Sequence, residues 1–236
     1  MRSDSGQAMV ETALTLPMVV FLMLGTLQLF LVTQGRILAQ LAAYRATRVA
    51  STNQGSCKRM LDAALVTVMP AVDPFLGRPG ATPGAKLAAA YAKRRNNRYA
   101  DAVSDGGAAV TYSGAVVWID RTFVGFGFDQ PGELLRLESR LVFWFPMRIP
   151  FANWVLARMY LAHAGLESYT AQNPLMMTQK ANWGAAGGTN ANLDASIRAE
   201  LQARVARGEY VFPIHTTFTM RMMTPLAAGG GSSACQ

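Results

Sequence analysis

The longest apolar run of the chain lies close to its N-terminus. Residues 12–32 contain no charged side chain. At about 1.5 Å per residue, a helix of this length spans roughly 30 Å, which is the thickness of a bilayer core. A buried helix of a soluble domain rarely needs so long an uninterrupted run. The pattern therefore predicts a membrane-spanning helix over residues 12–32.

The apolar pattern continues beyond this run without a proline. Residues 33–52 keep apolar side chains near helical spacing, which favours one helix that leaves the bilayer as a stalk. We expect these side chains to face the chain's own domain: Ile37, Leu38, Leu41, Ala42, Tyr44 and Val49. The helix should end at residues 53–55. The alternative is a separate surface helix after a break at Gly35.

The remainder of the chain predicts helices followed by strands. Helices are expected over 58–69, ended by Pro70, over 86–103, over 151–163, and from a cap at Asn192 or Asp194 to Arg207. Strands are expected within 108–126 and, from alternating side chains, over 134–147 and 209–223. Residues 70–84 and 173–189 read as loops. The fold class is therefore α+β, a long N-terminal transmembrane and stalk helix followed by a domain with a small antiparallel sheet and several helices.

The helix expected over residues 151–163 has an ambiguous apolar face. It carries Phe151, Trp154, Met159 and Tyr160 beside arginine. Tryptophan, tyrosine and arginine together are typical of a helix at a membrane interface. Packing in a protein core explains the same side chains equally well, so both interpretations stay open.

The residues in front of the apolar run differ from a general secretory signal. Such a signal is cut after its apolar region, whereas here the small residue Gly6 follows a short polar leader and precedes the run. Cleavage after Gly6 would place Glu11 fifth in the mature chain. The new amine of Gln7 would lie four residues earlier, on the same helical face as Glu11. Alternatively, Glu11 lies among the lipid headgroups, favoured by the helix dipole.

Two stretches resemble a known family. Residues 6–17, Gly-Gln-Ala-Met-Val-Glu-Thr-Ala-Leu-Thr-Leu-Pro, and the alanine-rich residues 38–50 are similar to TadE-like proteins, the minor pilins or pseudopilins of tight-adherence (Tad) pilus systems. The family often has an aromatic residue after the glutamate, where this chain has Thr12. TadG-type relatives carry a similar anchor without being processed.

The resemblance implies a domain organisation and a set of partners. Residues 1–6 would be a prepilin-type leader that a prepilin peptidase cuts between Gly6 and Gln7. Residues 7–55 would form the transmembrane helix and stalk, and residues 56–236 an extracytoplasmic α+β domain. The chain would cross the bacterial cytoplasmic (inner) membrane once, with its N-terminus inside, and would associate with other pilins and the inner-membrane assembly platform. Glu11 would set axial register during assembly.

Charge and cysteine content refine this expectation. The formal net charge is +8, and the densest basic cluster is Lys93, Arg94, Arg95 and Arg98, either a solvated face or a contact for headgroups or an acidic partner. Without a helix-turn-helix, RRM or zinc-finger pattern, we expect no nucleic-acid partner. Cys57 and Cys235 are candidates for a disulfide that ties the tail to the stalk. A glycine-rich tail equally allows Cys235 to stay free or to bond another chain.

Signatures of enzymes are missing from the sequence. There is no P-loop, Gly-x-Ser-x-Gly or His-Glu-x-x-His motif, and two cysteines with two distant histidines do not favour a metal site. We therefore expect no enzyme activity, no cofactor and no metal. The first functional hypothesis is a TadE-like minor pilin or pseudopilin for adhesion or secretion. The second is an unprocessed single-pass signal-anchor protein whose basic outer domain binds an envelope component.

Overall fold

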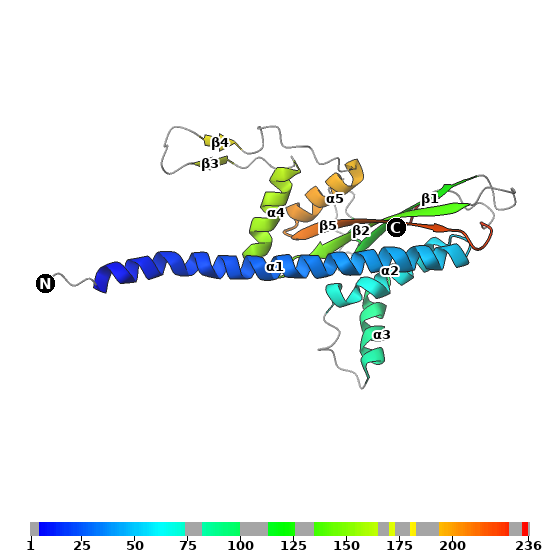
Figure 1. The fold of residues 1–236 in the computed structure, drawn as a ribbon, viewed down its shortest axis with the longest axis horizontal. Coiled ribbons are helices and arrows are strands. Elements are labelled where there is room, and N and C mark those ends of the chain that lie inside the picture. Colours follow the sequence, from blue (N-terminus) through cyan, green and yellow to red (C-terminus); the bar gives the residue numbers. More distant parts are fainter. Residues whose placement is uncertain are drawn as a thin grey trace. The chain divides into compact units, whose positions relative to one another are not determined.

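The computed structural model describes residues 5–73, 82–99, 113–125, 135–164, 170–172, 180–182, 194–226 and 233–235. Figure 1 shows the elements in chain order: α1 (Ser5–Thr52), α2 (Cys57–Val72), α3 (Pro83–Arg94), β1 (Val117–Val124), β2 (Arg136–Pro146), α4 (Ala152–His163), β3 (Thr170–Gln172), β4 (Lys180–Asn182), α5 (Ala195–Ala206), β5 (Val211–Arg221) and β6 (Ser233–Cys235). The chain divides into two compact units, residues 1–32 with 147–210 and residues 33–146 with 211–236.

Helix α1 is continuous over 48 residues. It passes through Gly35 without interruption, so the alternative of a separate surface helix after Gly35 is wrong. Gln54 and Gly55 follow with positive φ angles of 56° and 73°, and the Gly55 amide donates to the Ala50 carbonyl at 2.9 Å. This left-handed cap terminates the helix within the predicted residues 53–55.

The unit of residues 33–146 and 211–236 contains a four-stranded antiparallel sheet. Its strand order is β5-β2-β1-β6, and β2 pairs with the edge strand β5 from Arg136 opposite Arg221 to Pro146 opposite Val211. Side chains of β2 alternate between buried and exposed at its start and are buried continuously from residue 141 to 145. The predicted α+β class with a small antiparallel sheet is confirmed.

Small side chains join the C-terminal half of α1 to this sheet. The buried positions recur at helical spacing and are Gly35, Ala39, Ala42, Ala43, Ala46, Thr47, Ala50 and Ser51. Thr47 Oγ1 hydrogen-bonds Ser139 Oγ of β2, and Thr216 Oγ1 of β5 donates to the Ala39 carbonyl at 3.4 Å. Ile37 and Leu41 are instead 61% and 39% exposed, so the expectation that they face the domain was wrong. Small residues occupy this face because they let the helix backbone approach the sheet closely.

Three predicted boundaries also require correction. Helix α2 continues to Val72 through Pro70, because a proline in the last turn removes one backbone bond and leaves the remaining residues helical. Helix α3 begins at Pro83, where the Thr82 hydroxyl accepts the Ala85 amide at 3.2 Å, and ends at Arg94 instead of residue 103. Residues 100–103 lie outside the described residues. Lys180–Asn182, expected in a loop, forms β4 opposite β3.

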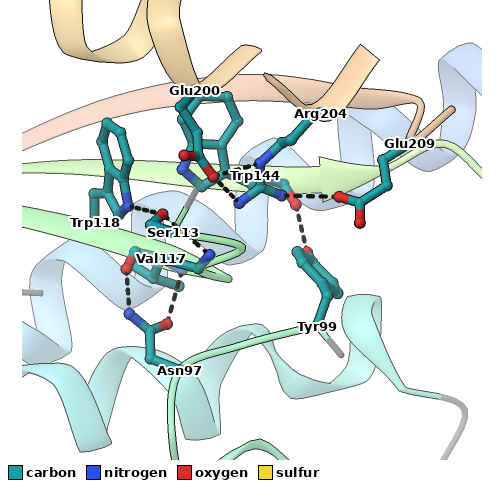
Figure 2. Close-up of polar contacts among 10 residues, drawn as sticks. Asn97, Tyr99, Ser113, Val117, Trp118, Trp144, Glu200, Arg204 and Glu209 are labelled. Atoms are coloured by element: carbon teal, nitrogen blue, oxygen red, sulfur yellow. Dashed lines mark hydrogen bonds and ion pairs between the residues drawn. The ribbon is translucent and has the colours of Figure 1, made fainter. Parts of the chain in front are cut away.

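Asn97 closes part of the free edge of β1. Its side-chain Nδ2 donates to the Val117 carbonyl at 2.7 Å, and its Oδ1 accepts the Val117 amide at 3.0 Å (Figure 2). The residue is buried and has a φ of 59°, a conformation that asparagine tolerates better than most residues. One amide side chain therefore replaces a neighbouring strand where β6 does not reach.

The unit of residues 1–32 and 147–210 carries α4, α5 and a buried ion pair. The Glu200 carboxylate accepts from Arg204 Nε at 2.9 Å and lies 2.8 Å from Arg204 Nη2, one turn along α5 (Figure 2). Glu209 Oε2 lies 4.0 Å from Arg204 Nη1. Glu200 and Arg204 are both almost completely buried. Each charge therefore needs the other to offset the cost of its removal from water.

Candidate functional site in the N-terminal half of α1

The N-terminal half of α1 exposes a long apolar surface. Every residue from Met9 to Val20 is exposed, and exposed large side chains continue with Leu22, Met23, Leu27, Leu29 and Phe30. Among the described residues, α1 is the one helix long and apolar enough to cross a membrane. A core helix of a soluble protein would be mostly buried, whereas only 6% of its most apolar stretch is buried. This surface fits lipid or another apolar helix.

The residues predicted to be processed or to set register lie at the start of this helix. Gly6 and Gln7 lie within its first turn, and Glu11 follows one turn after Gln7. Residues four apart share a helical face, so the backbone nitrogen of Gln7 and the Glu11 side chain lie on the same side. The Glu11 side chain is exposed.

A glutamine interrupts the apolar character of this half. Gln28 is completely buried, and its Oε1 accepts the backbone N–H of Ile149 at 3.0 Å. Two turns before Gln28, the ring of Phe21 contacts that of Phe151 edge to face, with centroids 5.5 Å apart. The turn before α4 therefore docks on α1 between residues 21 and 28. Reasoning from the sequence missed this contact, although a lone glutamine inside an uncharged run was the available signal.

The two cysteines meet at the edge of the sheet. Cys57 begins α2 and Cys235 ends β6, and the structure joins them in a disulfide with a Cα–Cα distance of 5.2 Å. Strand β6 pairs with β1, with Ile119 opposite Cys235. The bond closes a loop of 178 residues and attaches the end of the chain next to the end of α1. No cysteine remains free.

The basic cluster at the end of α3 is partly used for packing. Arg94 Nε lies 3.8 Å from Asp73 Oδ2, and its guanidinium stands 5.7 Å from the Tyr99 ring centroid. Lys93, Arg95 and Arg98 are exposed. On the same helix the Tyr91 hydroxyl donates to Asp62 of α2 at 2.8 Å, and burial together with this bond raises the pKa of Tyr91. Arg94 and Tyr91 thus hold α3 to its neighbours.

Neither histidine belongs to a cluster of candidate metal ligands. His163 ends α4 and His215 lies in β5. Within the part of the chain that the structure describes, no three histidine, cysteine, aspartate or glutamate side chains gather to hold an ion.

Comparison with known protein families gives one match. The family model described as TadE-like protein matches residues 6–48, which are nearly the whole of α1 and include both stretches of the predicted resemblance. Comparisons with curated proteins and with solved structures found no match. The rest of the chain lies outside the matched segment. Over its N-terminal helix the chain is similar to TadE-like proteins, and this match together with the exposed apolar helix indicates a membrane-anchored protein associated with the Tad pilus.

Proposed function

We propose that the chain is a minor pilin or pseudopilin of the TadE-like type, a structural subunit for assembly of a Tad pilus. One observation carries the proposal. The family match coincides with a helix whose two halves differ, because the N-terminal half is exposed and apolar and the C-terminal half is buried against a sheet. A subunit that moves from membrane to filament needs both, a surface for lipid or neighbouring helices and a rigid attachment to its domain.

The action of such a subunit is physical. Residues 1–6 are removed by a prepilin peptidase, residues 7–55 anchor and support the subunit, and residues 56–236 lie outside the cytoplasmic membrane. The apolar half of α1 first contacts lipid and then packs beside the helices of other pilins on the assembly platform. Exposed Ile37 and Leu41 extend that apolar surface beyond the membrane span, where lipid does not reach. The chain itself performs no catalysis in this account.

Glu11 sets the axial register between neighbouring subunits. An ionisable group at the edge of the hydrocarbon is costly, and pairing with an opposite charge reduces this cost. Cleavage after Gly6 creates a positive amine at Gln7, one helical turn away on the same face. That amine pairs with Glu11 of its own chain or of a neighbouring subunit. A charge pair at a fixed height on each helix aligns the subunits axially.

A glutamate substitution tests this role. Glu11→Ala should abolish surface pili while leaving the protein in the membrane fraction, because the apolar span is unchanged. Thr12→Ala is the matched control, since it is the adjacent residue and carries no charge. Electron microscopy and shearing assays measure piliation, and membrane fractionation measures insertion. Normal piliation with Glu11→Ala would count against the assembly role.

A further inference from the structure

The turn before α4 contacts a part of α1 that the sequence assigns to the bilayer interior. Ile149 is bonded to Gln28 and Phe151 contacts Phe21. If the hydrocarbon ended at Val32, Phe21 would lie about 16 Å below that edge, taking 1.5 Å per residue. Figure 1 shows α4 with its first end beside α1, running away from it. If α1 spans a bilayer, this segment distant in sequence enters the same depth as the contacted part of the helix.

Several backbone groups of this turn have hydrogen-bond partners within the same unit. Gln28 accepts the Ile149 amide, the Pro150 carbonyl accepts the Ala152 amide at 2.9 Å, and the Ile149 carbonyl accepts the Asn153 amide at 2.9 Å. Asn153 Nδ2 also donates to the Met147 carbonyl at 3.4 Å. Irregular backbone is tolerated near hydrocarbon only where its N–H and C=O groups have such partners. These bonds lower the cost of placing the turn near hydrocarbon, while Gln28 Nε2 is buried without a hydrogen-bond partner among the described residues.

The same segment directs large apolar side chains outward. Phe151, Trp154 and Met159 are exposed within nine residues, and Arg148 is exposed just before them. Ala157, Leu161 and Ala164 are buried and hold α4 in the fold. Met159 lies on the opposite side of the helix, whereas Trp154, two turns before Leu161, lies at the margin of the buried side. Exposed apolar side chains that include a tryptophan, beside a basic residue, suit the boundary between headgroups and acyl chains.

We propose that residues 147–163 form a membrane-interface foot, which binds the lipid bilayer at the leaflet where α1 leaves it. The occupant is lipid because exposed Phe151 directly contacts Phe21 of the anchor, which brings this segment next to the apolar surface of α1. The hydrocarbon core then ends near Gln28 instead of Val32, and Phe151 enters it by about 10 Å, the depth typical of interfacial helices. Counting about 20 residues back places the opposite edge near Ala8, within one turn of Glu11.

The foot rests on the proposed anchoring of α1, so its test includes both. The full chain, with its disulfide intact, is reconstituted in vesicles of phosphatidylcholine and phosphatidylglycerol and labelled at a single introduced cysteine with an environment-sensitive fluorophore. The three variants are Met159→Cys in the foot, Met223→Cys in the other unit, and Leu14→Cys in the anchor. Met223 is the matched control for Met159, because the two side chains are 66% and 64% exposed.

The expected result separates the two claims. The label at 159 should emit at shorter wavelength and be quenched by headgroup-proximal lipid quenchers several times more strongly than the label at 223, and the label at 14 should be quenched from the lipid as well. A water-exposed label at 159 beside a lipid-buried label at 14 would overturn the foot, leave its face to a protein partner, and keep the anchor. Water exposure at both positions would overturn the foot together with the anchor.

Discussion

Gly35 is a position at which α1 packs closely against the sheet. A Cβ atom placed there would lie 2.6 Å from Phe145 Cδ2 and 3.3 Å from Ile214 Cδ1. Carbon atoms do not tolerate the shorter distance, so the aromatic ring or the helix would have to shift. Gly25 of the same helix has no atom within 4 Å of the equivalent position. A methyl group can therefore be added at Gly25 without a clash, whereas at Gly35 the neighbouring atoms would have to move.

This difference gives a matched pair of variants. Gly35→Ala should lower the free energy of unfolding by about 1–3 kcal/mol, because overpacking outweighs the better helix propensity of alanine. Gly25→Ala should leave it unchanged or raise it by up to about 1 kcal/mol. Denaturant unfolding of the detergent-solubilised protein, followed by tryptophan fluorescence, measures both. Equal stability of the two variants would mean that α1 does not contact the sheet at Gly35.

The Glu200–Arg204 pair offers a second test, because each buried charge depends on the other. Glu200→Ala should cost about 3–5 kcal/mol by leaving Arg204 uncompensated, whereas the double variant Glu200→Leu, Arg204→Met should be close to the wild type. Arg198→Met, at an exposed position of the same helix, is the control and should change stability by less than about 0.5 kcal/mol. A double variant as unstable as the single one would contradict a mutually dependent pair.

Single side chains were the hardest features to predict. The Gln28 side chain bonds the backbone N–H of Ile149, more than 120 residues away. The Asn97 side chain bonds the backbone of Val117 in β1. Neither residue belongs to a periodic pattern, and an amide side chain looks the same in a sequence whether it faces water or replaces a strand. The roles of Gly6, Gln7 and Glu11 stay predictions, based on the position of these residues relative to an uncharged run.

The secondary-structure elements were more predictable. Strands β2 and β5 follow from apolar side chains at alternate positions. The membrane-spanning part of α1 follows from the uncharged run of residues 12–32, and its continuation follows from helical spacing without a proline over residues 33–52. The face of α1 that binds the sheet did not follow, because periodicity was read from large apolar residues while the contact uses glycine, alanine, serine and threonine. Such residues carry little hydrophobic signal and bury well only when a partner surface comes close.

The Cys57–Cys235 disulfide attaches β6, the last strand of the sheet, to the start of α2. Strand β6 has three residues and pairs only with β1, so its own hydrogen bonds hold it weakly. Replacing both cysteines, Cys57→Ser and Cys235→Ser, should lower the free energy of unfolding by about 2–5 kcal/mol. Amide exchange at residues 233–235 should accelerate far more than at the β2–β5 pairing. Unchanged protection of residues 233–235 would show that the strand is held without the bond.

At the scale of the whole molecule, the chain combines a helix that can cross a membrane, a sheet packed on the same helix, and a family match within that helix. The match leaves the residues after 48 without a counterpart, so the partner that they meet has to be inferred from surfaces. The exposed apolar half of α1 and the exposed apolar residues Phe151, Trp154 and Met159 all belong to the unit of residues 1–32 and 147–210. We therefore expect membrane and filament contacts to concentrate in this unit.

Processing of the N-terminus is the most direct test of the proposed function. The membrane-extracted protein is analysed by intact mass and N-terminal sequencing, from cells with and without their prepilin peptidase. The account predicts a mature chain that begins at Gln7 in the first case and at Met1 in the second. A chain that retains Met1 to Gly6 in both cases would contradict the pilin-type function, because Glu11 would then have no new amine to pair with.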